Sequence, residues 1–351
     1  MSSLPYADSA ARRIRVVLAS AWFGLSMVAC GGGGSGGGGS TESGESRAAT
    51  SASSTNIVQT SSSDTTGTTS DDGDTGSGAS EFRIFNAMLY ANMPSIGTRA
   101  PVVYESAFYP NGQQNADETP TDPGIAHAVS DARDQQGAPW FADPALTVID
   151  IERWSVWPFV EGPDHDVSIG RYANAAQRFR ASLGTPICLY AIAPEAGIVF
   201  ANWAITKPEI RAGWTAASDM TQRLLLPHVD ALCPQLYAFY GSADPLEEAK
   251  QIAEWKGFAR ETIREARRIG AGKPVYPFVW PQFHTGGSFA DYPFVPAHYW
   301  RAQLEAIRDE ADGLILWGGW NMANNQQMPW DPSAAWVQVL YDVFPETRAQ
   351  R

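Results

Sequence analysis

The stretch Leu146-Thr147-Val148-Ile149-Asp150-Ile151-Glu152-Arg153-Trp154 decides how this chain folds. It begins as a continuous apolar run rich in β-branched residues, which is typical of a strand buried on both faces in a parallel sheet. The run then gives way to two acids. Because side chains two residues apart on a strand share one face, Asp150 and Glu152 are expected to project together, roughly 6–7 Å apart along the chain.

Six further apolar runs resemble this one, and amphipathic stretches separate most of them. Alternating strands and helices predict a parallel sheet, and the first run is followed by no Gly-rich phosphate loop. We therefore predict one α/β domain over residues 81–351, a TIM-like (β/α) barrel of seven to eight parallel strands. The apolar runs are Phe82–Tyr90, Pro101–Phe108, Leu146–Ile151, Pro186–Ile192, Ala231–Tyr237, Pro274–Val279 and Asp312–Trp317, and the helical stretches are Ile125–Gln136, Tyr172–Ser182, Pro208–Leu226, Pro245–Ile269 and Pro296–Glu310.

Proline and glycine positions support these helix boundaries. Pro208, Pro245 and Pro296 fit first-turn positions, and Gly184 and Gly270 fit helix ends.

The first 80 residues have the composition of an export segment and a tether. Arg12, Arg13 and Arg15 precede an uncharged apolar run, residues 16–29, which is too short to span a bilayer as a permanent helix. Met27-Val28-Ala29-Cys30 resembles the bacterial lipobox, so residues 1–30 are predicted to be a lipoprotein signal peptide with lipidation at Cys30. The alternative is an ordinary signal peptide with an incidental cysteine.

Residues 31–80 begin with GGGGSGGGGS and continue almost wholly in Ser, Thr, Gly, Asp and Ala. Such a composition cannot bury enough apolar surface to fold, so we predict a disordered tether. We expect an exported bacterial lipoprotein of the cell envelope that touches the membrane only through its lipid. Gly after Cys30 favours the outer membrane or cell surface.

Charge and residue usage exclude several classes of partner. The net charge is −13, and no basic stripe is present, which argues against nucleic acid. The five histidines are scattered without metal-ligand spacing, so neither a metal nor another cofactor is expected, and we expect a monomer. Cys188 and Cys233 lie in apolar runs; they could pair in an oxidising compartment, but we favour two buried thiols.

The predicted strand ends combine acids, amides and aromatic side chains. Hydrogen-bonding groups among flat aromatic faces suit a sugar ring, whose hydroxyls point outward and whose C–H faces stack. Two like charges at one site push one pKa upward, giving one acid and one carboxylate, which glycoside cleavage requires. A structural acid pair held by Arg153 or by backbone amides is the alternative. The candidate glycan-binding residues are Trp154, Tyr190, Gln235, Tyr240, Trp280, Trp317 and Trp320.

Three short motifs, in matching order, resemble the hyaluronidase family, substrate-assisted glycosidases related to chitinases. They are Asp150-x-Glu152 before Arg-Trp, Gln235-x-Tyr237, and Gly313-Leu-Ile-Leu-Trp-Gly318. The resemblance implies hydrolysis, with retention, of a polysaccharide containing N-acetylhexosamine. It assigns Glu152 as acid and base, Asp150 and Tyr237 as partners of the substrate's acetamide, and Trp317 as a side of its pocket.

Two other functions stay open. Glu195 could act as a nucleophile with Glu152 in a two-carboxylate retaining glycosidase, whose substrate needs no acetamide. A tethered domain could also bind carbohydrate without cleaving it, although the intact acid pair speaks against this. The acidic balance suits a polyanionic glycan poorly.

Overall fold

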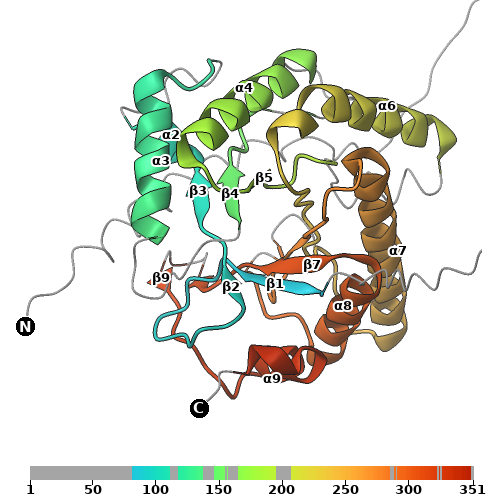
Figure 1. Cartoon of the computed structure of the whole chain (residues 1–351). Helices are drawn as coiled ribbons and strands as arrows, with labels where there is room; N and C mark the ends of the chain where they lie inside the picture. Colours follow the sequence, from blue (N-terminus) through green and yellow to red (C-terminus); the bar gives the residue numbers. More distant parts are fainter. Residues whose placement is uncertain are drawn as a thin grey trace, which may run out of the picture. The chain divides into compact units, whose positions relative to one another are not determined.

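Parallel strands alternate with helices in the computed structural model of the chain (Figure 1). The α/β class and the parallel strands predicted from the sequence are confirmed. The structure describes residues 81–110, 118–136, 146–154, 156, 165–194, 207–284, 288–289, 291–321, 324 and 326–348.

The strands form two parallel sheets and one short antiparallel pair. The first sheet has the order β2-β1-β7-β6 and the second the order β3-β4-β5, while β8 pairs with β9. The strands are β1 (Arg83–Asn86), β2 (Thr98–Arg99), β3 (Val102–Tyr104), β4 (Thr147–Asp150), β5 (Ile187–Leu189), β6 (Phe278–Val279), β7 (Gly313–Leu316), β8 (Trp320–Asn321) and β9 (Gln326–Gln327).

Backbone contacts connect the two parallel sheets at two places. Between β2 and β3, the Ala100 amide donates to the Asn86 carbonyl of β1, and the Pro101 carbonyl accepts from Val148 of β4. The predicted strand Ala231–Tyr237 forms no continuous ladder. Its isolated parallel bridges nevertheless join Cys233 to Tyr190 after β5, and Leu232 and Gln235 to Val275 and Phe278.

The helices pack against one another in chain order. Contacts run from α3 to α4, α6, α7, α8 and α9, and Figure 1 shows these helices around the strands. The α-helices are α2 (Glu105–Phe108), α3 (Asp122–Gln136), α4 (His165–Leu183), α6 (Pro208–Leu224), α7 (Pro245–Gly270), α8 (Ala297–Glu310) and α9 (Ala335–Val343), with 3-10 helices η1 (Leu226–His228) and η2 (Pro345–Thr347).

Side chains alternate between two apolar clusters along β1, β4, β6 and β7. In β4, Val148 belongs to a cluster built from residues of the parallel strands and of the segments that flank them, which we call the strand cluster, whereas Ile149 packs among the helices. This alternation fits strands that are buried on both faces. The strand cluster includes Phe85, Val102, Val148, Cys188, Cys233, Tyr276, Phe278 and Ile315.

The predicted helix boundaries are largely confirmed. Pro208 and Pro245 occupy first-turn positions, and Gly184 follows α4 with a φ of 78°. Pro296 lies one residue before α8 and acts as its N-cap. The α7 helix runs through Gly270 and ends at Ala271, whose φ is 49°, so the stop predicted at Gly270 was wrong by one residue.

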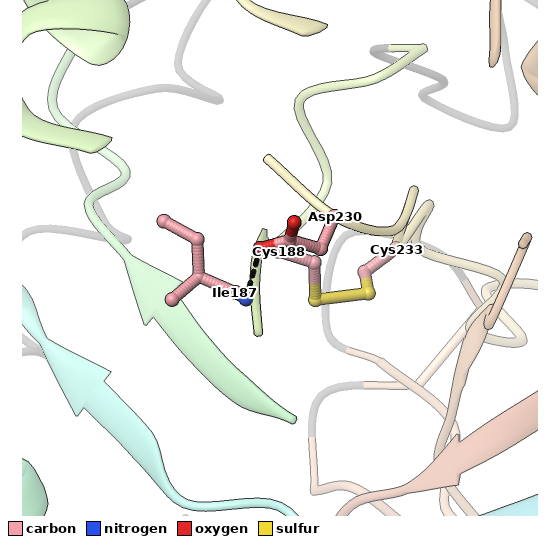
Figure 2. The surroundings of a disulfide bond; sticks show 4 residues. All are labelled: Ile187, Cys188, Asp230 and Cys233. Atoms are coloured by element: carbon pink, nitrogen blue, oxygen red, sulfur yellow. Dashed lines mark hydrogen bonds between the residues drawn. A yellow bond between two sulfur atoms is a disulfide. The ribbon is translucent and has the colours of Figure 1, made fainter. Parts of the chain in front are cut away.

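The prediction of two free thiols was wrong, because Cys188 and Cys233 form a disulfide (Figure 2). Cys188 lies in β5 and Cys233 in the neighbouring parallel segment, with Cα atoms 6.1 Å apart. Next to it, the Asp230 carboxylate accepts a hydrogen bond from the Ile187 amide over 3.0 Å. Both cysteines are fully buried, so the apolar runs that suggested buried thiols are equally compatible with a bridge.

The predicted signal peptide, Cys30 and the predicted tether lie outside the described residues. Their assignment stays a prediction. Within the described part of the chain, no helix combines the length and the apolar character needed to cross a membrane.

Candidate functional site

The acid pair lies where β4 ends. Asp150 is the last residue of this strand and pairs in register with Tyr104 at the end of β3. Its side chain is buried, with the residue 8% exposed, and its Oδ1 atom has no hydrogen-bond partner among the described residues. Glu152 follows two residues later and is accessible to solvent. One buried and one accessible carboxyl group therefore lie together at the end of this strand.

The strand cluster explains why other polar and aromatic side chains meet this pair. Side chains two residues apart on a strand share a face, so a residue two positions beyond a cluster member continues the same face toward the strand end. The resulting set is Tyr104 beyond Val102, Asp150 beyond Val148, Tyr190 beyond Cys188, Gln235 beyond Cys233, Trp280 beyond Phe278 and Trp317 beyond Ile315.

Both carboxyl groups are hard to ionise. Burial raises the pKa of Asp150 well above its usual value, and the charges of Glu152 and Glu105 raise it further. The surrounding protein also desolvates Glu152, and with the charge of Glu105 this raises the pKa of Glu152 to about 7. The sequence predicted one raised pKa, whereas the structure raises both. The pair therefore retains at least one proton near neutral pH.

Three tyrosine hydroxyls surround the carboxyl groups. The Gln235 amide nitrogen donates to the Tyr190 hydroxyl over 2.6 Å, and Tyr190 and Tyr237 are joined by a hydrogen bond between their hydroxyls. Burial raises the pKa of Tyr104, Tyr190 and Tyr237, so all three stay protonated and can donate hydrogen bonds. Tyr104 was absent from the predicted site; its apolar run gave no indication of which residue would stand beside Asp150.

Two tryptophans line the site next to these tyrosines. The ring of Tyr237 stacks on Trp317 at 5.8 Å between centroids and meets Trp280 edge-on at 5.6 Å. The Trp317 indole nitrogen donates to the Tyr104 hydroxyl over 3.2 Å. This bond leaves the Tyr104 hydroxyl hydrogen free to point elsewhere. The arrangement offers flat apolar faces beside hydroxyl donors, which suits a sugar ring.

Three other predicted residues lie in different surroundings. Trp154 is 2% exposed and packs edge-on against Tyr172 of α4, with centroids 4.9 Å apart, on the helix side of the strands. Trp320 is buried in β8, and Tyr240 is half-buried against the apolar cluster that faces the helices. The structure thus brings together Asp150, Glu152, Tyr190, Gln235, Tyr237, Trp280 and Trp317, but places the Trp154 ring in the core.

The described residues contain no cluster of possible metal ligands. No group of three or more His, Cys, Asp or Glu side chains is arranged there to hold an ion. Glu195, the alternative nucleophile, lies outside the described residues.

Comparison with known proteins gives structural neighbours only. No protein-family model matches the sequence, and a search of curated proteins finds no significant relative.

Among solved structures, bee venom hyaluronidase is similar with a TM-score of 0.48 and 17% identity, over 68% of this chain and 91% of its own. A GH18 chitinase from Pseudoalteromonas aurantia has a TM-score of 0.38 and 13% identity, over 70% and 76%. A fungal β-1,4-galactanase has a TM-score of 0.35 and 12% identity, over 69% and 86%. A hyaluronidase is thus among the solved structures that this chain resembles.

Proposed function

We propose that this protein is a glycoside hydrolase that cleaves a polysaccharide containing N-acetylhexosamine, with retention and by substrate-assisted catalysis. The observation that carries the proposal is the carboxyl pair at the end of β4. Asp150 and Glu152 hold a proton near neutral pH, and protonated tyrosines and tryptophan faces stand beside them. A proton donor close to a second carboxyl group is what glycosidic bond cleavage needs.

Glu152 is the acid and base of the proposed reaction, because it is the accessible member of the pair. In the first step it gives its proton to the glycosidic oxygen as that oxygen leaves the anomeric carbon. The carbonyl oxygen of the substrate's acetamide forms the new bond to that carbon from the opposite face, giving an oxazolinium ion. Glu152, now a carboxylate, removes a proton from water as the water attacks the anomeric carbon and reopens the ring.

Asp150 and Tyr237 orient the acetamide in this scheme. The Asp150 side chain lies deeper than Glu152, where its carbonyl oxygen can accept a hydrogen bond from the acetamide N–H and orient it. The Tyr237 hydroxyl donates to the acetamide oxygen, and Trp317 lies against the methyl group. No nucleophile from the protein is required.

We also propose that the seven parallel segments close into one TIM-like barrel. The bridges at Tyr190, Leu232 and Gln235, together with the contacts of residues 100 and 101, support a continuous ring of parallel segments. The site would then lie at the carboxyl ends of the strands, where barrel enzymes carry their reactive groups.

Export fits the same proposal. Stable disulfides are typical of oxidising compartments, so the bond between Cys188 and Cys233 supports a protein that leaves the cytoplasm. We propose that a lipid on Cys30 and the tether over residues 31–80 hold the enzyme at the cell envelope, where it meets a glycan substrate as a monomer.

Incubating the full-length protein with a glycan panel tests the reaction. The panel comprises hyaluronan, chondroitin, chitin oligosaccharides and glycans without acetamides. We expect cleavage of an acetamide-containing member, with the new reducing end first formed in the retained anomeric configuration by NMR. Inhibition by an N-acetylglucosamine thiazoline separates the two retaining mechanisms: an active enzyme that the thiazoline does not inhibit would favour a protein nucleophile such as Glu195.

A further inference from the structure

A buried ion pair lies immediately beside the acid pair and has no part in the reaction proposed above. Glu105 follows Tyr104, begins α2 and is only 5% exposed. Its Oε1 atom accepts hydrogen bonds from Nε and Nη2 of Arg153 over 2.8 and 2.6 Å. Arg153 is the residue directly after Glu152, so the ion pair fastens the Glu152 segment to the end of β3.

Stability alone is a weak reason for this arrangement. Taking two charges out of water costs free energy that their attraction only roughly offsets, and apolar replacements are often as stable. The ion pair also lies at a sensitive place, because Tyr104 and Asp150 are paired in register one residue away from Glu105. The charge of Glu105 therefore acts on both carboxyl groups of the acid pair.

We propose that Glu105 is a positioning residue for the general acid: paired with Arg153, it fixes the Glu152 segment against β3 and keeps the Glu152 carboxyl in its proton-donating form. The inference rests on the proposed glycosidase function, since it assigns Glu152 the same role. The charge of Glu105 contributes to the raised pKa of both Glu152 and Asp150, as expected of a like charge held nearby.

Several other groups act on Glu152 from the elements packed around it. Asp150 precedes it at the end of β4, and the Tyr104, Tyr190 and Tyr237 hydroxyls face it from β3, from the end of β5 and from the segment after Cys233. These tyrosines remain neutral because burial raises the pKa of each. Arg99 and Arg171 are also close, because their charges act on Tyr104 and on Tyr109. Of these charged groups, Glu105 is the one whose charge raises the pKa of Glu152.

Substitutions of the two partners of the ion pair are predicted to shift the pKa of Glu152 in opposite directions. Glu105→Gln removes the negative charge and keeps Arg153, so the pKa of Glu152 should fall by about one unit. Arg153→Met leaves Glu105 uncompensated, so the pKa of Glu152 should rise. A purely structural ion pair would give the same outcome for both variants, namely a less stable protein with an unchanged pKa.

The measurement is an NMR titration of the full-length protein labelled with ¹³C at the glutamate carboxyl, with the Glu152 signal assigned by its loss in Glu152→Gln. Glu265→Gln is the matched control, because Glu265 is similarly buried and its carboxylate accepts two hydrogen bonds from Arg268 on α7. We expect opposite shifts in Glu105→Gln and Arg153→Met, and none in the control. The alkaline limb of kcat/KM should move in parallel.

An unchanged Glu152 titration in Glu105→Gln overturns the inference, and so does loss of folding in both variants, which would make the ion pair structural. Because the titration requires no turnover, these results are distinct from a failure of the proposed function. That failure would appear as a wild-type protein that cleaves no member of the glycan panel.

Discussion

Glu152 combines access to solvent with a carboxyl group that the surrounding protein desolvates. Its pKa of about 7 means that the proton-donating form is lost as the pH rises through neutrality. We therefore predict that kcat/KM falls on the alkaline side, with a midpoint near pH 7, because the first step needs protonated Glu152. A pH–rate profile on a cleaved glycan measures this midpoint. A rate that stayed constant up to pH 9 would be incompatible with Glu152 as the acid.

The same carboxyl group should make stability depend on pH. Its pKa is about 7 in the folded protein against 4.5 for an unperturbed glutamate. A group whose pKa is raised on folding contributes stability that is fully present below its unfolded pKa and is lost as the pH rises through its folded pKa. The melting temperature should therefore fall between about pH 4.5 and pH 7.

Glu152→Gln should flatten this dependence, since glutamine cannot ionise. Thermal unfolding of both proteins from pH 4 to pH 8 tests the point. The melting temperature of the variant should rise relative to that of the wild type as the pH increases. A difference in melting temperature that did not vary with pH would show that Glu152 titrates normally.

At the element scale, strand packing limits the side chain that the position of Gly313 can hold. A Cβ atom on Gly313, at the start of β7, would lie 2.2 Å from the Arg83 carbonyl oxygen of β1. Gly313→Ala should therefore push the two strands apart and destabilise the fold by about 1–3 kcal/mol.

Gly170 in α4 is the matched control, because a Cβ there meets nothing within 4 Å. Gly170→Ala should stabilise the protein by about 0.5–1 kcal/mol, since alanine loses less conformational freedom in a helix. Urea unfolding of both variants gives the comparison. Equal effects in the two variants would mean that β1 and β7 are not packed as closely as described.

The long amphipathic helices were the elements best predicted from the sequence. Their apolar spacing and the prolines at or just before their first residues gave α7 and α8 to within a residue or two. The short elements were harder to predict. Pro101–Phe108 was read as one strand, but its second half is the helical turn α2, because four residues carry too little periodicity to separate the two. The helix α9 was missed.

The two-residue alternation of side chains holds only within a strand. It therefore does not predict where side chains beyond a strand end point, and this limited the prediction of the site. Trp154 has the same parity as Asp150 and Glu152, which would place it on their face if β4 continued. The strand ends at Asp150, and Tyr172 donates hydrogen bonds to the carbonyls of Ile151 and Trp154, so the chain turns and the Trp154 ring enters the helix side. Tyr104 ends β3 and Glu105 begins α2, so only the register of β3 with β4 places them beside Asp150.

At the scale of the whole molecule, the disulfide closes a loop of 45 residues between β5 and the next parallel segment. Cross-linking a loop of this length restricts the unfolded chain, so reduction should lower the free energy of unfolding by about 4 kcal/mol. Urea unfolding with and without a reductant measures the change. The double variant Cys188→Ser/Cys233→Ser should be insensitive to the reductant, and an equal response of both proteins would contradict a bond in the native state.

The central claim is that Glu152 is the proton donor of a glycosidase. Its most direct test is kcat/KM of the wild type and of Glu152→Gln on whichever glycan of the panel the wild type cleaves. Glutamine keeps the shape of the side chain but carries no acidic proton, so we predict a loss of about 10²–10⁴-fold, with the variant still folded by circular dichroism. A folded Glu152→Gln variant that cleaves the glycan at the wild-type rate would contradict the account.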